Sequence, residues 1–225
     1  MPFDRTHAFA NQCAVARGNI LLYPVWWLMA LFSRRADARC RIYESWFQFF
    51  GNAIVGGHVM LGPHAWCVNE MHDPERIVLE DDVICRGLLR VESFGDGRIV
   101  IREHVYIGDD VLISSACRVE IKADTLIAHG VQILDNDAHP LDVDERVGQW
   151  RQEDKGGRFR GASAPVLVEA RAWICTNAIV LKGVCIGEGS IVAAGSVVTS
   201  DIPSGVLAGG NPARVLRRLS PGETR

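Results

Sequence analysis

The chain has 225 residues, of which 48% are hydrophobic and 23% are charged, and its formal net charge is −3. This composition is typical of a folded domain. It excludes a disordered chain and argues against a bulk nucleic-acid binder. The seven cysteines include no pair with the C-x-x-C spacing of metal and redox motifs. We therefore interpret them as reduced thiols of a cytoplasmic protein.

Residues 1–50 are expected to form a helical N-terminal segment. Residues 20–32 (ILLYPVWWLMALF) are apolar, but they are fewer than the about 20 residues that a membrane-spanning helix needs. Residues 38–50 (ARCRIYESWFQFF) predict a second helix. Two interpretations of the apolar stretch stay open. It packs on the main domain, which we favour, or residues 20–35 lie on a membrane surface with their two arginines toward anionic headgroups.

A period of six residues dominates the C-terminal half of the chain. Steps of six from Val168 meet only valine and isoleucine, namely Ile174, Val180, Ile186, Val192 and Val198. The residues four positions further on are all short: Ala172, Ala178, Val184, Ser190 and Ser196. A hexapeptide period predicts a parallel β-helix, in which three short strands make one triangular turn and the aliphatic residue points inward. The expected fold class is therefore all-β.

The same pattern occurs upstream, with interruptions. The aliphatic position is held by Val55, Leu61, Cys67, Leu79, Cys85 and Val91, then by Ile101, Ile107 and Ile113, then by Ile121, Ile127 and Ile133. Asp73 and Pro74 predict a local loop, and the extra residues before Ile121 predict a bulge at a corner. We expect the β-helix over residues 51–203, with a long protruding loop at residues 139–163.

Residues 204–225 are expected to form a C-terminal cap and tail. The stretch Asn211–Leu219 (NPARVLRRL) predicts a short capping helix, with Pro212 favoured in its first turn. Such a helix would cover the open end of the β-helix, whose last strand otherwise leaves an edge exposed.

His139 is the histidine whose position points to chemistry. It stands where the repeat stops and the long loop begins, with Pro140 after it and Asp135, Asn136 and Asp137 before it. A carboxylate or carbonyl that accepts a hydrogen bond from one ring nitrogen would leave the other nitrogen as a base. The plainer interpretation is a loop histidine capped by an aspartate.

The other histidines and two of the cysteines are expected to have structural roles. The remaining histidines are expected at solvated or turn positions: His7, His58, His64, His72, His104 and His129. They do not have the spacing that brings three histidines to a zinc ion, so no metal site is expected. Cys67 and Cys85 occupy the aliphatic position and are interpreted as buried thiols stacked inside the β-helix.

These motifs resemble a known family. The strings WICTNAIVLKGVCIGEGSIVAAGSVVTSDIPSGVLAGGNPARVLRRL and AHPLDVDER resemble hexapeptide-repeat acyltransferases of the maltose and galactoside O-acetyltransferase type. The Trp-rich N-terminus resembles the colanic-acid acetyltransferases. The first resemblance covers the second half of the chain. It implies a left-handed β-helix, a homotrimer with active sites between subunits, and transfer of an acetyl group from acetyl-CoA to a sugar or polysaccharide precursor.

The resemblance also assigns roles to residues. His139 would be the general base. The coenzyme A positions of the family map onto Thr176, Ala194, Thr199, Arg214 and Arg217. The family's helper asparagine has no clear counterpart in the string YIGDDVLISS, and Asn136 is the candidate substitute. Ser200 stands where the family often carries a basic residue.

Three other functions stay open on the sequence alone. One is N-acetylation of an amino sugar or nucleotide sugar. Another is a non-catalytic trimeric scaffold, which would not need the His-Pro loop or the arginine-rich tail. The third is a zinc hydratase of the γ-carbonic-anhydrase type, which needs histidines that converge on zinc at a subunit boundary.

Overall fold

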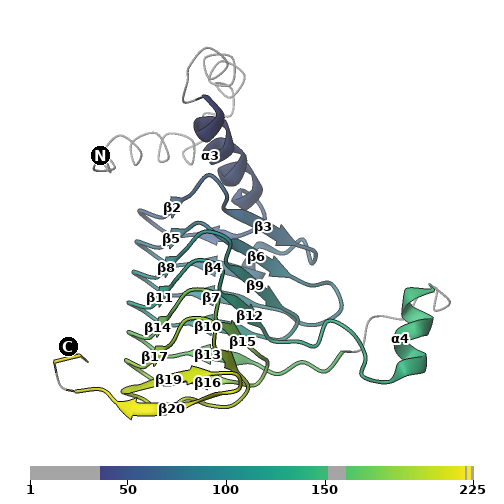
Figure 1. The fold of residues 1–225 in the computed structure, drawn as a ribbon. Helices are drawn as coiled ribbons and strands as arrows, with labels where there is room; N and C mark the ends of the chain where they lie inside the picture. The colour runs from purple at the N-terminus through teal and green to yellow at the C-terminus, as the bar shows by residue number, and fades with distance from the viewer. Residues whose placement is uncertain (1–35, 152–160, 221, 224–225) are drawn as a thin grey trace.

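The computed structural model describes residues 36–151, 161–220 and 222–223. Over these residues the chain forms a parallel β-helix of about six turns, seen from the side as a stack of coils in Figure 1. The expected all-β parallel β-helix is therefore confirmed. The apolar stretch of residues 20–32, and the membrane contact considered for residues 20–35, lie outside the described residues.

Each turn contributes one strand to each of three sheets, named A, B and C here. Sheet A contains β1 (Ile54–Val55), β4 (Ile77–Leu79), β7 (Ile99–Ile101), β10 (Val119–Ile121), β13 (Val166–Val168) and β16 (Cys185–Ile186). Sheet B contains β2 (Met60–Leu61), β5 (Ile84–Cys85), β8 (Tyr106–Ile107), β11 (Leu126–Ile127), β14 (Trp173–Ile174), β17 (Ile191–Val192), β19 (Val206–Gly210) and β20 (Ala213–Arg218). Sheet C contains β3 (Trp66–Asn69), β6 (Leu88–Val91), β9 (Leu112–Ser115), β12 (Gln132–Leu134), β15 (Ile179–Val180) and β18 (Val197–Val198).

The aliphatic repeat forms the core. In sheet A, the inward side chains of Leu79, Ile101, Ile121, Val168 and Ile186 stack in register, and none is more than 1% exposed. Sheets B and C contribute equivalent columns. Burial of each such side chain stabilises the fold by roughly 1.5–3 kcal/mol relative to an exposed one. The predicted inward positions are confirmed, except that a residue of the first turn, Val55, is only partly buried.

Cys67 and Cys85 are buried as predicted, but the prediction that they stack on each other is wrong. Cys85 pairs with Leu61 in sheet B, whereas Cys67 pairs with Leu89 in sheet C. Residues 70–76 are inserted between the two cysteines, so the chain has not returned to the same sheet. Burial in the apolar core raises the pKa of both thiols to about 12. Both therefore stay protonated and act as small apolar side chains.

The corners between sheets A and B share one backbone geometry. A residue with positive φ precedes the next strand by two positions: His58 (54°), Asp82 (58°), His104 (57°), Asp124 (58°) and Arg171 (59°). Aspartate, asparagine and histidine tolerate this left-handed conformation better than other side chains do. The short residues predicted from the repeat (Ala172, Ala178, Val184, Ser190 and Ser196) are all buried.

The long excursions leave the β-helix at the edge between sheets C and A. They follow β3, β6, β9 and β12 and comprise residues 70–76, 92–98, 116–118 and 135–165. The loop predicted at Asp73 and Pro74 is confirmed as a turn with the short helix η2 (Pro74–Arg76). The corner bulge predicted before Ile121 is confirmed at residues 116–118.

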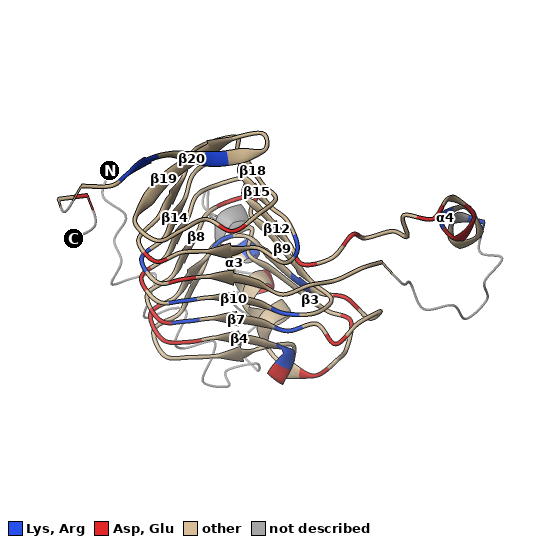
Figure 2. Ribbon diagram, turned by 90° about the horizontal axis from the view of Figure 1, so that it is seen from below, with Lys and Arg blue, Asp and Glu red and all other residues tan. Residues whose placement is uncertain are grey.

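The longest excursion is an arm that carries a helix the sequence did not predict. Helix α4 (Val143–Trp150) begins after Asp142, whose side chain accepts hydrogen bonds from the backbone N–H groups of Asp144 and Glu145. This N-cap satisfies two of the donors that a helix leaves unpaired at its start. Figures 1 and 2 show α4 standing clear of the coils in both views.

Helix α3 (Ala36–Phe49) covers the N-terminal end of the β-helix. Phe49 is fully buried, Trp46 is 9% exposed, and the Ser45 hydroxyl donates to the Gly62 carbonyl at 3.0 Å. The second predicted helix of the N-terminal segment is thereby confirmed. Among the described residues, no helix has both the length and the apolar character needed to cross a membrane.

The C-terminal end is closed by a pair of strands, so the predicted capping helix at Asn211–Leu219 is wrong. β19 continues sheet B beyond β17, and β20 runs antiparallel to β19, with Gly210 opposite Ala213. Asn211 and Pro212 form the turn between them. A helix would leave the polar backbone groups along the outer edge of β19 without partners, whereas β20 pairs them.

Gly187 and Gly189 lie in the turn between β16 and β17, and each position favours glycine for a different reason. Gly189 has a φ of +62°, and a Cβ there would meet no atom within 4 Å. A Cβ on Gly187 would lie 2.4 Å from the Ser204 nitrogen and 2.6 Å from the Pro203 carbonyl carbon. Gly189 adopts a left-handed backbone conformation, whereas Gly187 lets the last coil approach closely because it has no side chain.

We predict that Gly187→Ala lowers the free energy of unfolding by about 3 kcal/mol, because backbone atoms of the next coil must move. Gly189→Ala should cost only about 1 kcal/mol, the penalty of a left-handed alanine. Urea unfolding of both variants at equal protein concentration measures the difference. Equal losses would contradict the close-approach role of Gly187.

Candidate functional site

Asp135 anchors the start of the arm. Its side chain is fully buried and accepts from the Ser115 hydroxyl at 2.7 Å and from the backbone N–H groups of Ala116 at 2.7 Å and Cys117 at 2.9 Å. The Asn136 side-chain amide donates to the same carboxylate at 3.1 Å. Buried carboxylates are costly unless they are fully hydrogen-bonded. The three donors from Ser115, Ala116 and Cys117 therefore tie the arm to the corner bulge of the preceding coil.

Asn136, the candidate helper residue, forms hydrogen bonds within the base of the arm, the part next to the coils at residues 135–138 and 162–165. Its side chain is buried, and its Oδ1 accepts from the Ala138 N–H at 3.0 Å. Its backbone bridges to Ser163 on the returning strand of the arm. The amide thus shapes the turn that leads to His139, and its hydrogen bonds are directed at neighbouring residues of the chain.

His139 directly follows that turn and is exposed. Its backbone N–H donates to the Asp137 carbonyl at 2.6 Å. Its ring Nδ1 lies 3.1 Å from the Gln149 Oε1 of helix α4. The sequence predicted a carboxylate or carbonyl beside one ring nitrogen. The structure places a side-chain amide oxygen there, from a residue that the sequence analysis had missed.

A second tie holds the base of the arm against a later coil. The Asp137 carboxylate forms an ion pair with Lys182, which lies between β15 and β16. The Asp137 N–H donates to the Ala162 carbonyl at 3.0 Å, and the Ala164 N–H donates to the Asp135 carbonyl at 2.9 Å. The sequence did not point to Lys182, because its partner is 45 positions away. The polar run before His139 was the available signal.

Three of the residues mapped to coenzyme A, Thr176, Ala194 and Thr199, occupy two different edges of sheet C. Thr176 and Ala194 stack at the edge between sheets B and C, where the Gly195 N–H donates to the Thr176 carbonyl at 2.9 Å. Thr176 is half-buried and Ala194 is exposed. Thr199 follows β18, at the edge between sheets C and A where the arm also leaves. One chain therefore does not bring all of these residues together.

The two arginines lie on β20 and differ in their surroundings. Arg214 is exposed and donates from Nη1 to the Ala213 carbonyl at 2.7 Å. Arg217 forms two hydrogen bonds to the Glu223 carboxylate, at 2.9 and 2.7 Å. These bonds, with the Ser220 N–H and hydroxyl, lower the pKa of Glu223 to about 2. Glu223 therefore competes with any anion for the Arg217 guanidinium.

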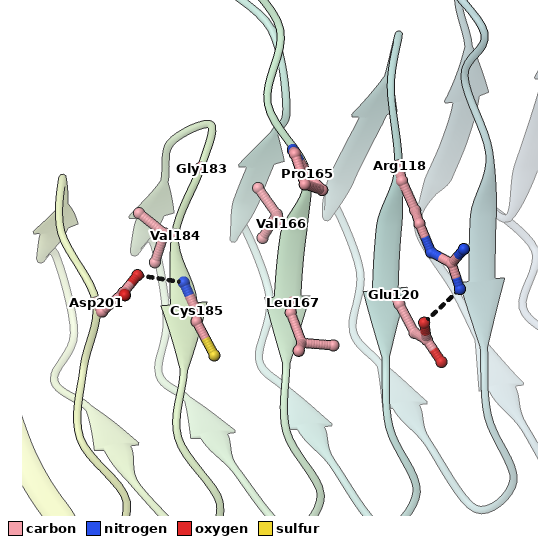
Figure 3. A pocket seen from close by; sticks show the side chains of 9 residues that line it. All are labelled: Arg118, Glu120, Pro165, Val166, Leu167, Gly183, Val184, Cys185 and Asp201. Carbon is pink, nitrogen blue, oxygen red and sulfur yellow. Dashed lines mark hydrogen bonds and ion pairs between the residues drawn. The ribbon is translucent and has the colours of Figure 1, made fainter.

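A hollow of about 330 Å³ lies on the outer face of sheet A, across β10, β13 and β16 (Figure 3). At one end Arg118 donates to Glu120 at 2.7 Å, and at the other the Cys185 N–H donates to Asp201 at 2.8 Å. Leu167 lies between them. Pro165, at the end of the arm that returns to β13, also lines the hollow, so the hollow lies where the arm rejoins the coils.

Two other histidines lie on the edge between sheets A and B, among aspartates. The His58 Nδ1 is 3.5 Å from Asp82, and the His104 ring lies 3.6 Å from Asp82 and 3.3 Å from Asp124. Both imidazoles are more than half exposed, at 66% and 57%. Within the described ranges, no group of three or more His, Cys, Asp and Glu side chains is arranged to hold a metal ion.

Curated relatives of the chain carry acetyltransferase names. A candidate lipopolysaccharide-biosynthesis O-acetyltransferase of Escherichia coli, WbbJ, is 32% identical over 138 residues, which are 59% of this chain and 66% of that protein. A candidate acetyltransferase of Saccharomyces cerevisiae, YJL218W, is 34% identical over 122 residues, which are 54% of this chain and 57% of that protein. The chain thus spans less than two thirds of the length of either relative. No family model matches it.

A solved structure with a similar fold is a hexapeptide-repeat acetyltransferase of Vibrio cholerae, VCA0836, in complex with acetyl-CoA. Its TM-score is 0.53 at 23% identity, and the match covers 96% of this chain and 90% of that one. At this identity the likeness shows the fold. Together with the curated relatives, it confirms the resemblance to hexapeptide-repeat acyltransferases with a left-handed β-helix.

We predict that Asp135→Ala lowers the free energy of unfolding by roughly 3 kcal/mol, because it leaves buried donors without an acceptor. The arm should also open more often, so limited proteolysis within residues 139–163 should accelerate. Asp144→Ala, in the exposed first turn of α4, is the control and should change stability by less than about 0.5 kcal/mol. Unchanged stability and proteolysis of Asp135→Ala would contradict the anchoring role.

Proposed function

We propose that the chain is an acyltransferase that moves an acetyl group from acetyl-CoA to a hydroxyl group of a sugar or polysaccharide precursor. The observation that carries the proposal is the position of His139, where a long arm leaves the β-helix of a chain whose curated relatives carry acetyltransferase names. The name of the Escherichia coli relative, a lipopolysaccharide O-acetyltransferase, favours a hydroxyl acceptor over an amine.

The edge between sheets B and C has features that suit acetyl-CoA. Ala193 and Ala194 have small side chains, so an extended pantetheine arm can approach the backbone closely. Thr176 stacks on Ala194 one coil earlier. Exposed Arg214 provides a guanidinium group suited to phosphate. Arg217 can bind phosphate only when its ion pair with Glu223 is broken, so we assign Arg217 the smaller contribution to acetyl-CoA binding.

His139 supplies the proton transfer in this proposal. In its neutral form it takes the proton of the acceptor hydroxyl as the oxygen attacks the thioester carbon, and it returns that proton to the departing thiolate. A positioned general base of this kind accelerates such reactions by typically about 10²–10⁴-fold. Charge that develops on the thioester oxygen needs a donor, for which we propose a backbone N–H.

We propose that the active unit is a homotrimer with each site between two subunits. His139 and Thr199 lie at the edge between sheets C and A, whereas Thr176 and Ala194 lie at the edge between sheets B and C. A complete site therefore needs edges from two copies. Exposed apolar side chains on sheet B support association: Leu126 and Trp173 pair in register and are 41% and 45% exposed.

The acceptor has room beside the base of the arm. The hollow on sheet A offers carboxylate and guanidinium groups that can bind hydroxyl groups, over an apolar floor. A panel of sugars and amino sugars incubated with acetyl-CoA, with thiol release as the readout, tests the proposed activity. Thiol release with hydroxyl acceptors supports it, release with amine acceptors alone would replace O- with N-acetylation, and no release with any acceptor would leave a scaffold function.

We predict that His139→Ala lowers turnover by at least about a hundredfold, because the general base is lost. The matched control is His104→Ala, which removes another exposed imidazole from a different edge and should leave turnover unchanged. Light scattering should give a trimeric mass for wild type and both variants. Near-normal thiol release by His139→Ala would contradict its role as the general base. A monomeric mass for the wild-type protein would contradict the proposed homotrimer.

We predict that Arg214→Ala combined with Arg217→Ala raises the KM for acetyl-CoA more than it lowers kcat. Contacts to the nucleotide phosphates lie far from the thioester, so they stabilise ground and transition states alike. Of the single variants, Arg214→Ala should have the larger effect, because Glu223 occupies Arg217. An unchanged KM in the double variant would refute the placement of acetyl-CoA on β20.

A further inference from the structure

Gln149 is the residue that the arm brings back to His139. The two are ten positions apart, and their contact joins the Gln149 Oε1 to the His139 Nδ1 at 3.1 Å. The contact requires the chain to reverse its direction between His139 and α4, which begins at Val143. Nothing in the repeat pattern requires this reversal, since the coils are complete without the arm.

The reversal is held by bonds on both sides of the contact. The Asp142 side chain caps the first turn of α4. The Arg146 Nη1 donates to the carbonyls of Pro140 and Leu141, each at 3.0 Å. These bonds tie the helix to the two residues directly after His139. Gln149, one turn further along α4, is thereby held at the imidazole.

We infer that Gln149 is a positioning residue that sets the ring orientation and tautomer of His139; this rests on the proposed role of His139 as the base. When the amide oxygen accepts from Nδ1–H, the proton stays on Nδ1 and the lone pair is on Nε2. Because the amide is neutral, it orients the ring without adding a negative charge beside it. A carboxylate at the same place would favour the charged imidazolium instead.

The charged residues that hold the arm on either side of His139 stay constant in the test. On the coil side, Asp137 is paired with Lys182. On the arm, Arg146 bonds backbone carbonyls, and Asp142 caps the helix. A change of charge at position 149 therefore acts at a side chain that contacts the Nδ1 of the ring.

The test uses Gln149→Glu, Gln149→Leu and a matched control, Gln132→Glu, which adds the same charge on the outer face of β12. The imidazole of His139 is titrated by NMR in the full-length protein, and kcat/KM is measured against pH. For Gln149→Glu we expect the imidazole midpoint to rise by several tenths to about one pH unit. A base must be neutral to act, so the acid limb of kcat/KM should move to higher pH by the same amount.

For Gln149→Leu we expect a smaller fraction of the Nδ1–H tautomer at high pH and a lower kcat, with the KM for acetyl-CoA unchanged. Gln132→Glu should reproduce the wild-type titration. An imidazole midpoint in Gln149→Glu that coincides with that of wild type or of Gln132→Glu overturns the inference. A midpoint that moves while the acid limb stays in place supports the contact and overturns the proposed role of His139, so the two failures are distinguishable.

Discussion

The rest of the structure depends on one constraint, the in-register stacking of one inward aliphatic side chain per strand. Leu79, Ile101, Ile121, Val168 and Ile186 form one such column, and each strand is too short to bury its side chain without the coil above and the coil below. The core is a line of nearest-neighbour contacts, so stability is approximately a sum over adjacent coils. An insertion is tolerated only where it leaves this register intact.

This constraint explains where the candidate site lies. Excursions after β3, β6, β9 and β12 all leave at the edge between sheets C and A, so their bases stack in one column. The base of the longest one is bound to the coil before it through Asp135 and to a coil after it through Asp137 and Lys182. A regular scaffold thus holds an irregular segment firmly at its root, while α4 stands away from the coils. Functional residues often occupy loops that a rigid scaffold positions in this way.

Charge is distributed according to the same geometry. Inward positions hold apolar side chains, and charged residues gather at the corners, where they pair between successive coils. Arg102, for example, lies between Glu80 and Glu120, with hydrogen bonds to both at 2.6 Å. Because these side chains are partly exposed, each pair contributes little to stability. The pairs instead bring opposite charges of neighbouring coils face to face, as Glu80, Arg102 and Glu120 show.

The sequence by itself determined the β-helix, the inward residues and the place of the arm, because a period of six and its interruptions are local properties of the chain. It also singled out His139, which stands where the repeat stops. Only the tertiary structure decided that Asn211–Leu219 holds a strand, since the edge of β19 supplies its partner. Only the tertiary structure brought Gln149 to His139 and Lys182 to Asp137. These contacts depend on where the arm turns back and on which coil it meets. The repeat pattern of the sequence predicts neither.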